Sequence, residues 1–106
     1  MSEQELVNSI LFYITLMGGV SLRINSGVRV IKGDGGKTRV FRGAPKGTSD
    51  ILCCWRGRFC AIECKVGKNT ASPEQLQFIE DVKAAGGIGF VTWDLETVQR
   101  TLESIF

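Results

Sequence analysis

Apolar residues recur along the chain at two spacings, and pairs of glycines separate some of the stretches. Intervals of three and four residues predict helices, whereas strict alternation predicts β-strands. Glycine pairs at 18–19 and 86–87 end two of the helical stretches. In chain order the pattern predicts a helix at 3–17, a strand at 20–25, extended segments at 28–31 and 38–41, strands at 51–55 and 59–66, a helix from 73 to the glycines at 86–87, a strand at 88–93 and a last helix, capped by Asp94, to about 105.

The order of these elements indicates an α/β protein in which helices flank the faces of a mixed sheet. Ser2 precedes the first helix as a cap. Ser72 and Gln75 have the spacing of a capping box at the start of the second helix. The whole chain, residues 1–106, fits a single domain with one hydrophobic core.

The net charge of +2 is small, but the basic residues are concentrated in one segment. Between 23 and 46 a single acid, Asp34, accompanies seven bases: Arg23, Arg29, Lys32, Lys37, Arg39, Arg42 and Lys46. Such a segment indicates a surface that meets an anionic partner, and the alternative is a solvated basic loop. The turn at 32–38 lacks the glycine spacing of a phosphate loop and precedes an extended segment, so we expect no nucleotide cofactor.

Histidine is absent from the sequence, which excludes Ser-His-Asp and Cys-His catalysis, HNH-type nucleases and most zinc enzymes. Acid–base chemistry must therefore use carboxylates, lysine, tyrosine or a metal-bound water. The four cysteines form no C-x-x-C pair, and their spacing is typical of small buried residues: Cys53, Cys54, Cys60 and Cys64. Acidic residues near the start argue against a signal peptide, and no apolar run reaches membrane-spanning length. We expect a cytoplasmic protein with reduced thiols and no membrane partner.

Charged residues interrupt the predicted hairpin at 51–66. Side chains alternate between the faces of a strand, so Glu63 and Lys65 project side by side. Asp50 stands at the start of the preceding strand, and antiparallel pairing brings that end close to Glu63. Two carboxylates near a backbone carbonyl suit a hard divalent cation, beside which Lys65 would orient or deprotonate a water molecule. The alternative is an exposed ion pair between Glu63 and Lys65, worth only about 0–1 kcal/mol.

The first helix adds a further candidate acid. Glu3 falls on the apolar stripe of that helix, whereas Glu5 points roughly opposite. A metal ion or its waters would explain a carboxylate on the core-facing edge. The alternative is an ordinary acid in the first helical turn, where it favours the helix dipole.

The hairpin acids and the lysine resemble a known signature. Asp50 followed by Glu63-Cys64-Lys65 is similar to the PD-(D/E)xK nuclease motif, in which D precedes E-x-K on a hairpin. Further segments in the same order resemble the VRR-NUC family, the virus-type replication-repair nucleases, over nearly the whole chain to about Val98. A departure is Ser49, where members often have proline before the aspartate. The segments are RINSG at 23–27, GTSD at 47–50, IECK at 62–65, SPEQL at 72–76 and AAGG at 84–87.

The resemblance implies a PD-(D/E)xK, restriction-endonuclease-like core with the order α-β-β-β-α-β. It implies Mg²⁺ or Mn²⁺ held by Asp50, Glu63 and the backbone carbonyl of Cys64. Lys65 would position the attacking water or stabilise charge, and Gln75 would be the glutamine that follows E-x-K in the family. The acid of the first helix maps to Glu3 or Glu5, and the helical-face argument favours Glu3, which would reach the metal directly or through water.

The resemblance further implies a metal-dependent DNA endonuclease that selects branched or four-way junction DNA during replication, repair or recombination. Free-standing members resemble archaeal Holliday-junction resolvases, so a homodimer is expected, and a phage origin would place it in the cytoplasm of the host. The residues expected to hold DNA are Arg23, Asn25, Arg29, Lys37, Arg39, Arg42 and Lys46. The alternatives are a catalytically inactive DNA-binding or assembly module on a nuclease-like fold, and a structural domain whose hairpin charges are solvated.

Overall fold

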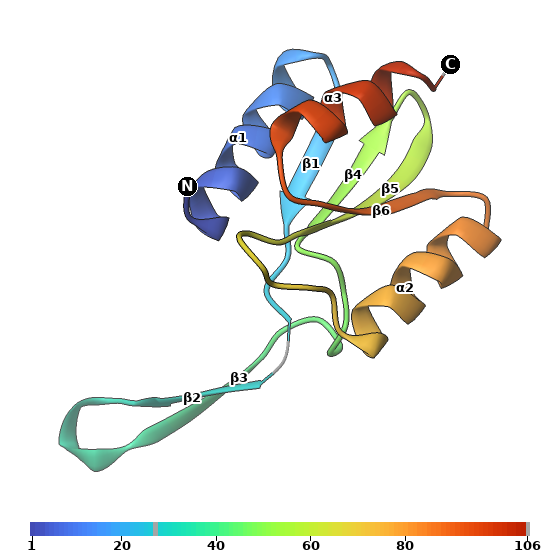
Figure 1. Cartoon of the computed structure of the whole chain (residues 1–106). Helices are drawn as coiled ribbons and strands as arrows, with labels where there is room; N and C mark the ends of the chain where they lie inside the picture. The colour runs from blue at the N-terminus through green and yellow to red at the C-terminus, as the bar shows by residue number, and fades with distance from the viewer. Residues whose placement is uncertain (27, 106) are drawn as a thin grey trace.

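A run of strands lies between the first two α-helices in a computed structural model that describes residues 1–26 and 28–105 (Figure 1). The side chains of Val28, Arg29 and Phe41 lie outside this description. The elements are α1 (Glu3–Leu16), β1 (Val20–Arg23), β2 (Val28–Lys32), the 3₁₀ turn η1 (Asp34–Gly36), β3 (Thr38–Arg42), β4 (Ile51–Trp55), β5 (Arg58–Cys64), α2 (Pro73–Ala84), β6 (Ile88–Thr92) and α3 (Leu95–Glu103).

The main sheet has four strands in the order β1-β4-β5-β6. The β1–β4 and β4–β5 pairs are antiparallel, whereas β5 and β6 are parallel. A parallel pair needs a long crossover, and α2 supplies it. The predicted mixed sheet with flanking helices is therefore confirmed. The extended segments predicted at 28–31 and 38–41 form a separate antiparallel ribbon, β2–β3.

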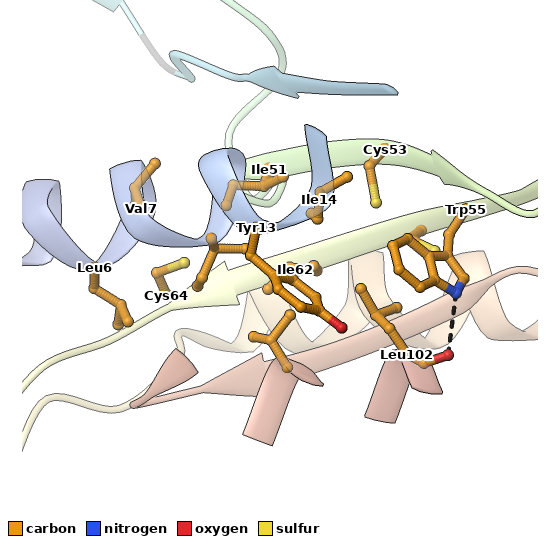
Figure 2. Packing of buried hydrophobic residues seen from close by; sticks show 13 residues of the cluster. Leu6, Val7, Tyr13, Ile14, Ile51, Cys53, Trp55, Ile62, Cys64 and Leu102 are labelled. Atoms are coloured by element: carbon orange, nitrogen blue, oxygen red, sulfur yellow. Dashed lines mark hydrogen bonds between the residues drawn. The ribbon is translucent and has the colours of Figure 1, made fainter. Parts of the chain in front are cut away.

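The hydrophobic core lies between α1, α3 and one face of the sheet (Figure 2). Trp55 from β4 is fully buried, and its Nε1–H donates a hydrogen bond to the Leu102 carbonyl of α3 at 3.0 Å. The Tyr13 ring of α1 stacks on Trp55 with the ring centroids 6.1 Å apart. These contacts hold α1 and α3 on the sheet. Both involve residues near the C-terminal ends of the two helices.

The other face of the sheet is only partly covered. α2 packs on β5 and β6, where Gly89 allows close approach, because a Cβ at that position would lie 3.0 Å from the Ile79 backbone oxygen. On β1 and β4 the same face stays open, so Val20, Leu22 and Cys54 are exposed. The expectation that the cysteines are buried thus holds for three of them, and Cys54 departs from it because it points to this open side.

Most element starts agree with the sequence prediction, and several ends fall one or two residues earlier or later. The hairpin turns at Arg56-Gly57 as predicted, and both residues have positive φ, 49° and 80°. The first strand ends at Arg23 rather than at 25, and the hydrogen bond from the Ile24 N–H to the Asp50 carbonyl is its last contact with the start of β4. Among the described residues, no helix combines the length and apolarity needed to cross a membrane.

Candidate active site

Asp50 and Glu63 lie on facing ends of β4 and β5. The strands pair with Ile51 opposite Ile62, which places the preceding Asp50 opposite the following Glu63 on the same face. The Asp50 Oδ2 accepts a hydrogen bond of 2.8 Å from the backbone N–H of Cys64. The Asp50 side chain therefore reaches across the hairpin to the residue beside Glu63, and the two acids converge as the sequence predicted.

Glu63 is a buried acid with an unsatisfied oxygen. Only 1% of the residue is exposed. Its Oε1 lies 3.4 Å from the Lys65 Nζ, whereas its Oε2 has no hydrogen-bond partner among the described residues. The pKa of Glu63 is raised to about 8, mainly by burial and then by the neighbouring Asp50 carboxyl. Lys65 lowers this pKa and so opposes part of the shift. In the absence of another cation, burial and the Asp50 carboxyl therefore disfavour the charged form of Glu63.

Lys65 continues from the end of β5 into the same pocket. Its backbone N–H donates to the Thr92 carbonyl of β6 at 2.9 Å, which fixes the direction of the side chain. The side chain is 14% exposed. The alternative of a solvated Glu63–Lys65 ion pair is therefore wrong, because the pair is inside the protein.

The two candidate acids of α1 have separate roles. Glu5 closes the capping box, since its Oε1 accepts a 3.1 Å hydrogen bond from the Ser2 N–H. The pKa of the Cys64 thiol is raised to about 12, mainly by burial. Nearby carboxylates raise this pKa further. Glu3 is one of these carboxylates and is half-buried, whereas Glu5 is engaged in capping.

Gln75 also serves as a capping residue. Its Oε1 accepts a hydrogen bond of 2.8 Å from the Ser72 N–H, and its own N–H donates to the Ser72 Oγ at 3.2 Å. The capping interpretation is confirmed. The amide nitrogen of Gln75 takes no part in this capping box.

The packing of Gly47 and Ser49, which precede Asp50, was not predicted from the sequence. Gly47 has a φ of +95° and lies against α2, since a Cβ there would come 2.8 Å from the Glu74 carbonyl oxygen. Ser49 is fully buried, and its Oγ has no hydrogen-bond partner in the described residues. The only signal in the sequence was a glycine and a small polar residue close to the aspartate. The contacts of Gly47 are made with a distant part of the chain, so this signal could not predict them.

The structure separates the predicted DNA-binding residues into two groups. Arg23 ends β1 beside the site and opposes the rise in the pKa of Cys64. Lys46 is exposed and lies 3.8 Å from Glu74. Asn25 is exposed, and its carbonyl accepts a hydrogen bond from the Ala44 N–H at 2.9 Å. The other residues lie on the β2–β3 ribbon, away from the acids: Lys37, Arg39, Arg42, and Arg29, whose side chain is outside the described part.

The acidic pocket fits a magnesium-like ion by its donor set. In residues 1–26 and 28–105, no group of three or more His, Cys, Asp or Glu side chains gathers closely enough to bind a metal. Mg²⁺ is usually held by one or two carboxylates, several waters and substrate phosphates. Asp50 and Glu63 supply those two carboxylates, and the Glu63 Oε2 is satisfied by no donor in the described residues and has the Asp50 carboxyl as its neighbour. Glu3 would then act through a water molecule.

Comparison with known proteins does not assign the chain to a family. No protein-family model matches the sequence, and no curated protein matches it.

Proposed function

We propose that this protein is a Mg²⁺- or Mn²⁺-dependent DNA endonuclease of the PD-(D/E)xK type, related to the VRR-NUC nucleases it resembles. The observation that carries the proposal is the buried Glu63 Oε2, which has no hydrogen-bond donor in the described chain and belongs to a carboxyl group that interacts with that of Asp50. The order α1-β1-β4-β5-α2-β6 agrees with the core implied by the resemblance. A bound cation would relieve the repulsion between the carboxylates of Asp50 and the buried Glu63.

Each residue of the pocket has a defined chemical role in this proposal. Asp50, Glu63 and the Cys64 carbonyl would hold the ion, with Glu3 attached through water. When bound, the ion lowers the pKa of a water molecule and stabilises charge on the phosphoryl group. Lys65 keeps its ammonium group within 3.4 Å of Glu63, where it orients the attacking water and donates to a phosphate oxygen.

Branched or four-way junction DNA is the substrate class that we propose, and a homodimer is the assembly. Cutting a junction symmetrically needs two active sites, whereas one chain carries one. The open apolar face of β1, β4 and the start of β5 supports a contact between two copies, because exposed apolar patches mark protein interfaces and this one includes Val20, Leu22 and Phe59. β1 also offers an unpaired edge of the sheet.

Two alternatives remain in competition with this proposal. A binding-only module on a nuclease-like fold has no need of the complete set of Asp50, Glu63 and Lys65. A structural domain with solvated hairpin charges is disfavoured, because Glu63 is buried and one of its oxygens finds no partner in the described residues.

The proposal is tested by cleavage of branched, flapped and linear DNA in Mg²⁺, in Mn²⁺ and in EDTA. We expect cutting in either metal, no cutting in EDTA, and loss of cutting in Glu63→Gln. Glu80→Gln is the matched control, because Glu80 is an exposed glutamate on α2 that pairs only with Lys83 in the described structure. Cleavage that survives in Glu63→Gln would contradict the proposal, and binding of DNA without cleavage in any metal would favour the inactive module.

A further inference from the structure

The β2–β3 ribbon projects from the body of the protein as an arm (Figure 1). The molecule measures 53 Å along its longest axis and only 29 and 28 Å along the other two. The arm is an insertion between β1 and β4, and its strands pair from Val28–Arg42 at the base to Lys32–Thr38 near the tip. At about 3.4 Å per residue, its five-residue strands reach roughly 17 Å.

The base of the arm adjoins the candidate active site. The Ile24 N–H donates a hydrogen bond to the Asp50 carbonyl at 2.7 Å. Ser26 and Ala44 form an isolated bridge, and a Cβ at Gly43 would collide with the Asn25 carbonyl, so the two sides are tightly packed. Whatever the arm binds is therefore held within one arm length of Asp50.

The two faces of the arm carry apolar residues that the protein does not cover. Val30 lies opposite Val40, and these residues are 66% and 57% exposed. Lys32 and Arg42 flank this pair along the same face. On the other face Ile31 lies opposite Arg39, beside a shallow hollow of about 450 Å³ near the tip. Apolar side chains at the centre of a basic ribbon indicate a partner that offers both apolar and anionic surface.

The charge of the arm is complementary to a polyanion. Four exposed bases lie on it against the single acid Asp34: Lys32, Lys37, Arg39 and Arg42. In the described part of the chain none of these four takes part in an ion pair. They are available for phosphates, whereas a second copy of this basic arm would repel them.

The width of the arm distinguishes between the two grooves of DNA. Paired strands lie about 5 Å apart, and a ribbon of this kind enters the major groove, which is about 12 Å wide. The minor groove, at about 6 Å, accepts such a ribbon only where the duplex is bent and the groove is widened, which costs deformation energy. In the major groove, valine side chains meet base edges and thymine methyl groups, while the flanking lysines and arginines reach the phosphates of both walls.

We propose that the β2–β3 arm enters the major groove of a duplex segment beside the scissile bond. This inference rests on the proposed action on DNA and adds a requirement for the substrate. An arm of roughly 17 Å covers half of a 34 Å helical turn, so the substrate must keep about five base pairs of duplex next to the cut. Single-stranded DNA does not satisfy this requirement.

The test is the affinity for a labelled duplex and for a single strand of the same sequence, measured by anisotropy in EDTA over a series of salt concentrations. The double variant Val30→Ser/Val40→Ser should bind the duplex about tenfold more weakly with an unchanged salt slope, and the single strand as before. Lys37→Ala and Arg39→Ala should each lower the salt slope by about one. Leu16→Ser, an exposed apolar residue of α1, is the matched control and should change nothing.

A second measurement identifies the groove. A duplex loaded with methyl green, which occupies the major groove, should lose affinity for the protein, whereas one loaded with netropsin, a minor-groove ligand, should keep it. Inhibition by netropsin alone would overturn the inference. Unchanged duplex binding by Val30→Ser/Val40→Ser would also overturn the inference. This includes the case in which the double variant alters only self-association.

The test of the groove inference and the test of the nuclease proposal can fail independently. If metal-dependent cleavage is absent but duplex binding depends on Val30 and Val40, the nuclease proposal fails and the groove inference stands. If the protein cleaves DNA and the arm variants bind and cut like the wild type, the nuclease proposal stands and the groove inference fails.

Discussion

The protein contains two antiparallel hairpins whose apolar cross-strand pairs meet opposite environments. In β4–β5, Ile51 and Ile62 are completely buried, and so is the Glu63 that follows. In β2–β3, the corresponding cross-strand pair of Val30 and Val40 is exposed. The difference comes from what covers each hairpin, since helices and further strands enclose the first and nothing in the described chain encloses the second. In β4–β5, burial raises the pKa of Glu63. In β2–β3, exposure leaves the basic side chains available for binding.

The largest difference between the hairpins is expected in catalysis. Lys65→Ala in the buried hairpin should lower the rate of DNA cleavage by about 10²–10³-fold, because it removes a preorganised donor from the reacting groups. DNA affinity should stay close to that of the wild type. Arg39→Ala in the arm should do the reverse, weakening binding while saturating DNA restores the rate. Single-turnover cleavage over a range of protein concentrations separates the two effects, and an equal loss of rate in both variants would contradict the division of roles.

Stability should show the same contrast. Ile62→Ala leaves a cavity in the core and should lower the free energy of unfolding by about 2–5 kcal/mol. Val40→Ala on the exposed arm should change it by less than about 0.5 kcal/mol. Urea unfolding followed by tryptophan fluorescence measures both, since Trp55 lies in the core. A large loss of stability in Val40→Ala would mean that the arm packs on another surface.

The pH dependence of stability should come from the buried hairpin. Burial first, and then Asp50, raises the pKa of Glu63 from an ordinary 4.5 to about 8. Between these values the folded protein binds a proton that the unfolded chain has released, so the free energy of unfolding falls as pH rises through this interval. In EDTA we expect a decline on the order of 1–3 kcal/mol from pH 5 to pH 8. Thermal unfolding at several pH values measures it.

The matched variants of that experiment are Glu63→Gln and Glu80→Gln. Glu63→Gln removes the titrating group and should flatten the profile, whereas the exposed Glu80→Gln should leave it unchanged. A profile that keeps its full slope in Glu63→Gln would show that another group titrates.

The smallest expected effect concerns self-association through the open sheet face. Leu22→Asp places a charge in the exposed apolar patch and should convert dimers into monomers at micromolar concentration. Leu76→Asp, an exposed leucine on α2, is the control and should leave the dimer intact. Sedimentation velocity distinguishes these outcomes, and a wild-type protein that stays monomeric with and without DNA would contradict the proposed dimer.

Local sequence patterns were sufficient to predict the elements and the approach of the two acids. Alternation placed Glu63 and Lys65 on one face, and the hairpin pairing brought Asp50 opposite Glu63. The serine and glutamine at the start of α2 predicted the capping box that the structure contains. These features involve neighbours on the same helix or hairpin, so a short stretch of sequence determines them.

Other features depend on contacts that no local pattern encodes. The alternation at 28–31 is the same whether a ribbon is covered or projects from the protein, so the exposure of Val30 was not predictable. The close packing of Gly47 on Glu74 joins two distant segments. The burial of Glu63 likewise requires β6 beside it, and that parallel pairing is set by the crossover through α2.

The central claim is that Asp50 and Glu63 together bind a divalent cation, and calorimetric titration with Mn²⁺ tests it most directly. We predict binding to the wild-type protein, loss of binding in Asp50→Asn and in Glu63→Gln, and unchanged binding in Asp34→Asn, whose carboxylate lies at the tip of the arm. Mn²⁺ binding that persists in both Asp50→Asn and Glu63→Gln would contradict the claim.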